Sequence, residues 1–182
     1  MHPRMEETLA YLDSQQAALR EAVELIPAAQ REEQPGADRW SVAQVLDHLA
    51  QIEKRITLLL TKRIGGARAA GIGPELETSS VLNSVPTALI VDRSRQVAAP
   101  EEVRPESGMD AATAWAELEK SGAALRAAAL TGDGLALSEV RHTHPALGEI
   151  NLYQWLLFVG SHKARHILQV REIAEQLKGS AG

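Results

Sequence analysis

Two histidines, His162 and His166, lie four residues apart in the stretch "GSHKARHILQV" near the C-terminus of this 182-residue chain. In an α-helix, side chains at positions i and i+4 project side by side, with Cβ atoms roughly 6 Å apart. A third histidine, His48, lies in a separate helical pattern, "SVAQVLDHLAQIE". Neutral imidazole binds Zn²⁺, Ni²⁺, Fe²⁺ and Cu²⁺, and three such ligands leave a coordination position open. This pattern therefore indicates a three-histidine site for a divalent metal ion.

A simpler interpretation of the His162 and His166 pair is that both are core residues bonded to their neighbours. The third histidine argues against it, because every buried imidazole needs hydrogen-bond partners and destabilises the fold without them. A second alternative, a helical zinc protease, requires a glutamate base directly after the first histidine of the pair. Lys163 occupies that position, so the sequence excludes the protease class.

The other histidines and the acidic neighbours are weaker candidates. His142 and His144 lie in "RHTHPALGEIN", which we interpret as the turn before the last helix, where both would bond the backbone. We expect no role for His2. Asp47 directly precedes His48 and lies about 100° away from it around the helix, and Glu53 is a more distant candidate for a general base. No carboxylate is clearly placed for hydrolysis.

Helical periodicity dominates the chain and predicts an all-α fold. We expect four long helices, at residues 3–26, 41–66, 111–130 and 151–177, which form one domain over residues 1–182. Ser41 followed by Gln44, and Asn151 followed by Gln154, are typical of helix starts. The long crossover between the second and third helices, residues 67–110, favours a four-helix bundle. Within this crossover, the stretch "TALIVDRSRQV" fits a short helix or an extended segment equally well.

In the second and fourth helices the three histidines lie on apolar stripes, which we expect to face the interior of the bundle. We interpret Trp40, just before the Ser41 cap, as a hydrophobic staple. The stripes consist of Val45, His48, Ile52, Ile56 and Leu59 in the second helix and of Leu152, Trp155, Val159, His162, His166, Val170, Ile173 and Leu177 in the fourth.

Composition narrows the classes of partner. The chain has 19 Lys and Arg against 24 Asp and Glu, a formal charge of -5, and no basic run, so we expect no nucleic-acid partner. It has no cysteine, which leaves His, Asp and Glu as metal ligands. No apolar stretch reaches the roughly 18 residues of a membrane span. We therefore expect a soluble cytoplasmic protein that does not bind membranes.

Three stretches together resemble the DinB-like (DinB/YfiT-like metalloenzyme) superfamily of four-helix-bundle proteins. They are "RWSVAQVLDHLAQIE" at 39–53, "VAAPEEVRP" at 97–105 and "HPALGEINLYQWLLFVGSHKARHILQVREI" at 144–173. The resemblance implies that His48, His162 and His166 are the metal ligands, that the ion is nickel, zinc or iron, and that the protein is a homodimer. Several related groups are enzymes that use mycothiol or bacillithiol. The family name does not imply DNA binding.

These observations lead to an expected function. The expected protein is a metal-dependent enzyme whose open coordination position activates a small molecule, such as a low-molecular-weight thiol, for transferase-type chemistry. A metal-dependent hydrolase is the weaker enzymatic option, because no carboxylate is placed as a base. The alternative class is a non-catalytic, metal-bearing stress-response or ligand-binding module. Activity assays on the metal-loaded protein would separate the two classes.

Overall fold

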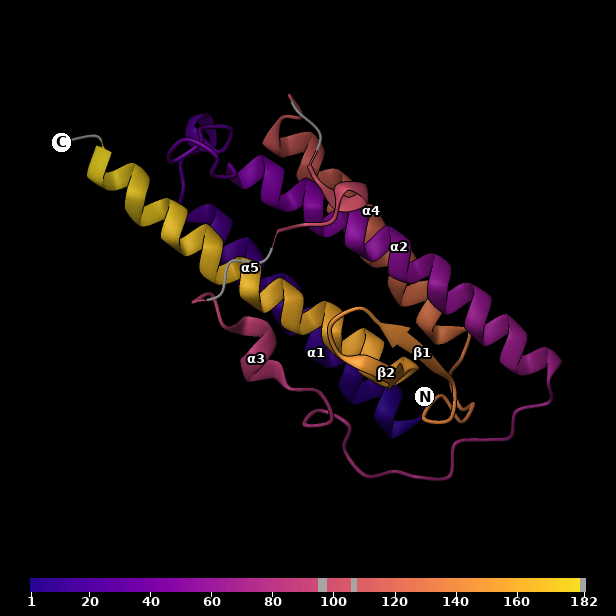
Figure 1. Cartoon of the computed structure of the whole chain (residues 1–182). Coiled ribbons are helices and arrows are strands. Elements are labelled where there is room, and N and C mark those ends of the chain that lie inside the picture. The colour runs from indigo at the N-terminus through magenta and orange to yellow at the C-terminus, as the bar shows by residue number, and fades with distance from the viewer. Residues whose placement is uncertain (95–97, 106–107, 181–182) are drawn as a thin grey trace.

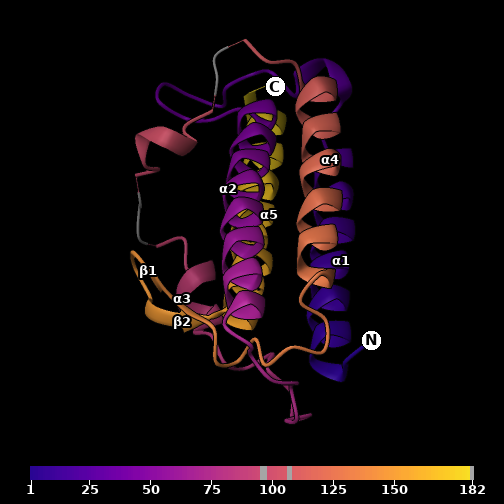
Figure 2. The same ribbon diagram turned by 90° about the vertical axis from the view of Figure 1, so that its right-hand side faces the viewer.

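Four long helices, drawn in Figure 1, make up most of the computed structural model, which describes residues 1–94, 98–105 and 108–180. They are α1 (Pro3–Glu24), α2 (Val42–Ala69), α4 (Ala111–Leu130) and α5 (Leu152–Ser180). Helix α1 packs on α5, and α2 packs on α4. Seen from the side, α1 and α4 lie on one side of α2 and α5, while the crossover and a β-hairpin lie on the other (Figure 2).

The predicted helix starts are confirmed. The Ser41 hydroxyl accepts a hydrogen bond from the Gln44 N–H at 3.3 Å, and the Gln44 side chain accepts one from the Ser41 N–H at 3.0 Å. Asn151 and Gln154 repeat this reciprocal pair at the start of α5, at 3.0 and 2.9 Å. Such caps satisfy backbone donors that the first helical turn leaves unpaired. The starts of the two helices that carry the histidines are therefore set locally.

The predicted end of the second helix is wrong. Helix α2 continues through Gly65 and Gly66 to Ala69. A helical glycine costs only about 1 kcal/mol relative to alanine, which neighbouring turns can offset. The helix ends instead before Gly71, which has φ +75 and whose N–H donates to the Arg68 carbonyl. That left-handed conformation favours glycine and ends the helix.

The all-α prediction also needs correction, because a small antiparallel sheet precedes α5. Strand β1 (Arg141–His144) pairs with β2 (Gly148–Asn151), with His144 opposite Gly148. The pattern in this stretch predicted a turn. Strands of four residues are too short for alternation to stand out, and Gly148, at φ +73, permits the tight return of the chain. The fold is mostly helical with one two-stranded sheet.

The crossover contains the short helix α3 (Thr87–Val91) and a 3₁₀ turn at Glu101–Val103; a second 3₁₀ turn, Ala28–Gln30, follows α1. The stretch "TALIVDRSRQV" thus begins as a helix, and its residues 95–97 lie outside the described residues. Residue 97, the first of the stretch "VAAPEEVRP", lies outside them as well. Within the described ranges, the helices are too short or too polar to cross a membrane.

The apolar core is divided into two clusters by a layer of polar side chains. One cluster is built around residues such as Leu9, Leu60 and Leu156, and the other around Leu46 and Val170. Between them the helices place the buried groups His48, His166, Glu53, Lys163 and Ser121. Buried polar groups are stable only where they find partners. We therefore expect the functional site of the protein in this polar layer.

Candidate metal centre

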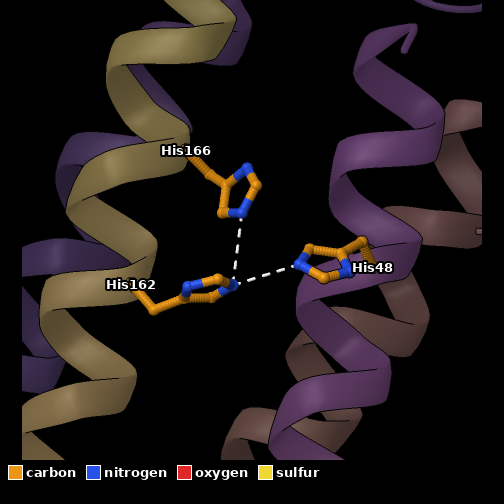
Figure 3. A group of neighbouring side chains, drawn as sticks. All are labelled: His48, His162 and His166. Atoms are coloured by element: carbon orange, nitrogen blue, oxygen red, sulfur yellow. Dashed lines mark hydrogen bonds between the residues drawn. The ribbon is translucent and has the colours of Figure 1, made fainter. Parts of the chain in front are cut away.

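The three predicted histidines meet between α2 and α5 (Figure 3). The Nε2 atom of His162 lies 3.0 Å from Nε2 of His48 and 3.2 Å from Nε2 of His166. One ligand atom from each of the three rings lies within 4.8 Å of the others. His48 comes from α2, and the other two come from successive turns of α5. Helix packing thus brings the sequence-predicted group together.

The outer nitrogen of two of these rings is held by an acceptor. His48 Nδ1 lies 2.6 Å from the Val103 carbonyl oxygen, and His166 Nδ1 lies 2.8 Å from the Gln169 side-chain oxygen. A carbonyl oxygen only accepts hydrogen bonds, so each Nδ1 must carry a proton. In a neutral ring the Nε2 atom then has a free lone pair. His48 and His166 therefore direct lone pairs toward the centre of the group.

Gln169 is in turn oriented from the surface. Its side-chain oxygen also accepts a hydrogen bond from Arg93 at 3.4 Å. Arg93 binds both carboxylate oxygens of Glu172, at 2.7 and 2.8 Å. This chain of contacts places an oxygen, rather than the amide nitrogen, opposite His166. Outer partners of this kind fix the ring orientation of ligating histidines.

The partner of His48 comes from the crossover. Val103 is buried at the end of the 3₁₀ turn Glu101–Val103. The next residue, Arg104, accepts a hydrogen bond at its carbonyl from the Gln51 side chain at 3.0 Å. The crossover is thereby attached to α2 at His48 and again at Gln51, about one turn further along the helix. Sequence reasoning did not identify Val103, because its backbone oxygen leaves no mark in the residue type.

Aromatic rings cover the histidines. The ring of Trp40 lies 5.0 Å from that of His48 and stacks on that of His166 at 6.3 Å, with an interplanar angle of 12°. On the other side, Phe158 stacks on His162 at 5.5 Å. The sequence predicts Trp40 as a hydrophobic staple for α2. In the structure its ring lies against His48 and His166 and forms a wall of the site. These apolar walls reduce the access of water to the nitrogens.

Burial lowers the pKa of all three rings. Desolvation brings the pKa of His162 to about 3, helped by the nearby His48. It also places the pKa of His166 well below 6.5 and lowers the pKa of His48, against the opposing effect of the Val103 carbonyl. All three rings are therefore neutral near pH 7, as metal ligation requires. Three neutral imidazoles with convergent Nε2 atoms are a donor set that fits a divalent transition metal ion.

The hairpin histidines do not belong to this group. His144 Nδ1 accepts hydrogen bonds from the backbone N–H groups of Ala146 and Leu147, at 3.1 and 3.2 Å, as the sequence analysis expected. His142, by contrast, contacts a side chain: its Nδ1 lies 2.5 Å from Nη2 of Arg63. His2 accepts a hydrogen bond from the Arg4 N–H at the start of α1.

The two acidic candidates lie outside the histidine group as well. Glu53 directs its carboxylate to Lys163 at 2.7 Å and to Ser121 at 2.6 Å. Asp47 is buried and accepts a hydrogen bond from Gln51 at 2.9 Å. Among the described residues, the cluster that could hold a metal ion consists of the three histidines alone.

The fold and the site define a class of protein: a mostly helical chain that places three neutral imidazoles between two of its long helices. The chain belongs to the DinB superfamily, whose family model matches residues 4–170, a span that includes all three histidines. It is also similar to the uncharacterized protein YuaE of Bacillus subtilis (strain 168), at 28% identity over 147 residues, which cover 80% of this chain and 84% of the relative. No solved structure matches the chain.

Proposed function

We propose that His48, His162 and His166 bind one divalent transition metal ion, nickel, zinc or iron, and that its open coordination position activates a small thiol for transferase chemistry. The observation that carries this proposal is the convergence of three Nε2 atoms from two helices, with the Nδ1 atoms of His48 and His166 held by acceptors. Structural zinc is normally closed by four protein ligands. Three ligands leave room for a substrate.

The chemistry follows from the charge of this donor set. A divalent ion held by three neutral ligands retains two positive charges, which favour an anionic fourth ligand and lower the pKa of a thiol at the open position. The chain's own residues have positioning roles. Val103 and Gln169 hold His48 and His166 in orientation, while Trp40 and Phe158 limit the access of water.

Hydrolysis is a weaker proposal, since Glu53 binds Lys163 and lies outside the histidine cluster. The same observation favours one second candidate, a metal-bearing binding module without catalysis. In that case the three histidines would hold a ligand through the ion, and no acid or base would be required.

Cobalt substitution tests the thiol proposal. In protein shown to hold one cobalt ion, addition of a small thiol such as 2-mercaptoethanol is expected to produce a sulfur-to-metal charge-transfer band in the visible or near-ultraviolet spectrum. If neither thiols nor small anions change the spectrum of the loaded protein, the open position does not exist, and the thiol proposal is wrong. A spectral response without turnover of any thiol-transfer substrate would favour the binding module.

We also infer that the four long helices form a single four-helix bundle domain and that the protein is a cytoplasmic homodimer. Exposed leucines, such as Leu58 at 72% and Leu76 at 83% exposure, provide apolar surface that a second copy could cover. Light scattering tests the dimer. A mass near 19.7 kDa, that of one chain, across micromolar concentrations would contradict it.

A further inference from the structure

A hollow of about 300 Å³ is lined mainly by residues of α1 and α4. These two helices lie on the side of the molecule away from the crossover (Figure 2). Helices α1 and α4 pack on α5 and α2 respectively and make little contact with each other. Side chains of α2 and α5 reach the hollow through Glu53 and Lys163, whereas none of the three metal-site histidines lines it. It is therefore a second feature of the polar layer, separate from the candidate metal centre.

A buried ion pair lies at this hollow. Lys163 Nζ is 2.7 Å from a Glu53 carboxylate oxygen, and the two side chains are 4% and 2% exposed. The ammonium also donates to the Gln16 side chain at 2.7 Å, and Ser121 donates to the other Glu53 oxygen at 2.6 Å. An ammonium has three N–H donors, and each carboxylate oxygen can accept more than one hydrogen bond. The pair thus retains both donor and acceptor capacity beside the hollow.

The remaining walls of the hollow are largely apolar, and at one of them Gly122 has no side chain to fill the space. A Cβ atom built on Gly122 of α4 would meet only the Glu53 carboxylate, at 3.5 Å, which is an ordinary van der Waals distance. Because Gly122 lines the hollow, we expect a larger side chain at this position to occupy part of its space. The apolar lining residues are Leu9, Leu12, Leu118, Gly122, Ala123 and Leu125.

The charges around the hollow are balanced. Lys163 is neutralised by Glu53. At the rim Arg126 of α4 binds both carboxylate oxygens of Asp13 of α1, at 2.9 and 2.8 Å, and Glu119 of α4 pairs with Arg20 of α1 at 2.6 Å. A ligand with a net charge would lose hydration without finding an uncompensated partner. A neutral ligand whose head group both donates and accepts hydrogen bonds matches the adjacent ammonium and carboxylate. Its volume lies at the lower end of the range for small-molecule sites, so the matching ligand is small.

We propose that this hollow binds a small neutral molecule with an apolar body and a head group that both donates and accepts hydrogen bonds, of the class of primary amides and alcohols. The apolar body packs between Leu9 and Leu118, and the head group lies against Lys163 and Glu53. This site is independent of metal, because it shares no ligand atom with the three histidines.

The probe that tests the proposal is hexanamide, titrated into metal-free protein and followed by ¹H–¹⁵N NMR. Shift changes are expected to cluster at the hollow, on α1 and α4 and around Lys163. Gly122→Leu is expected to weaken binding about tenfold or more, because the added side chain fills the space. Gly66→Leu is the matched control, since Gly66 is a helical glycine with open space around its Cβ position. That variant is expected to bind hexanamide like the wild type.

Two further comparisons test the head group. Hexanoate, the anion of the same shape, is expected to bind more weakly than hexanamide. The double variant Glu53→Met/Lys163→Met keeps the volume of the pair but removes its polar atoms, so hexanamide is expected to lose affinity there too. The proposal is overturned if millimolar hexanamide causes no localised shifts, if Gly122→Leu binds it like the wild type, or if hexanoate or the double variant binds equally well. Because the assay contains no metal, its failure would leave the proposed metal chemistry unaffected.

Discussion

The ammonium of Lys163 lies 2.7 Å from the carboxylate of Glu53, although Lys163 directly follows His162, whose ring faces His48 on the same partner helix. Successive side chains of a helix point about 100° apart, so His162 and Lys163 leave α5 in different directions and reach α2 at different positions. Helices α2 and α5 are therefore joined twice within the polar layer, once by imidazoles and once by a buried ion pair. The ion pair with Glu53 gives Lys163, the residue directly after His162, a structural role of its own.

Removal of one member of the ion pair is expected to destabilise the protein strongly. Lys163→Met leaves the Glu53 carboxylate buried without its cation, and such losses cost about 3–5 kcal/mol. The double variant Glu53→Met/Lys163→Met, which removes both charges, is expected to recover most of that free energy of unfolding. Urea denaturation of metal-free protein measures both. A single variant within about 0.5 kcal/mol of the wild type would show that the pair contributes little.

Loss of one imidazole is expected to abolish metal binding. His162→Ala removes the ring whose Nε2 lies closest to both other ligand atoms. Elemental analysis of protein purified without an affinity tag is expected to find about one divalent ion per wild-type chain and essentially none in the variant. His142→Ala and His144→Ala are the controls and are expected to keep full occupancy. Equal metal content in His162→Ala and the wild type would place the site elsewhere.

The contact between Gln169 and His166 is expected to tune metal affinity. Gln169→Ala leaves His166 Nδ1 without its acceptor, so the ring can rotate or change tautomer. Changes to such partners typically weaken metal affinity about 10- to 100-fold. Gln169→Glu retains an oxygen acceptor and is expected to bind metal as tightly as the wild type or more so. Competition with a chromophoric chelator measures the affinities, and equal values for Gln169→Ala and the wild type would contradict a positioning role.

Acidification is expected to destabilise the metal-free protein. Desolvation lowers the pKa of His162 from 6.5 to about 3 in the folded state, so between these values the unfolded chain binds the proton and the folded chain does not. The free energy of unfolding is therefore unaffected well above pH 6.5 and falls as the pH drops from 6.5 toward 3. His48 and His166, whose pKa values are also lowered, act in the same direction.

The variant His162→Gln isolates this effect from the titration of carboxylates. Its free energy of unfolding is expected to fall less between pH 7 and pH 5 than that of the wild type, with both measured by urea denaturation after chelator treatment. Parallel pH profiles for the two proteins would show that His162 is not kept neutral by burial. In the metal-loaded protein the same protons compete with the ion, so affinity is expected to fall with pH.

Features that depend on near neighbours along the chain could be predicted from the amino-acid sequence. Ser41 with Gln44, and Asn151 with Gln154, predicted two helix starts because capping joins residues three positions apart. The side-by-side placement of His162 and His166 follows from the helical repeat alone. The apolar stripe around His48 predicted that its ring is buried. The end of α2 and the hairpin were missed because a single glycine and two four-residue strands are weak local signals.

Which groups meet from separate helices and from the crossover depends on the packing of the whole chain. His48 and His162 are 114 positions apart, and His48 and Val103 are 55 apart. The Val103 carbonyl is a backbone group that every residue carries, so no residue type marks it as a partner. Glu53 was a candidate base for the metal site until helix packing placed it against Lys163. Long-range contacts of this kind depend on how side-chain volumes fit between helices, which local periodicity does not specify.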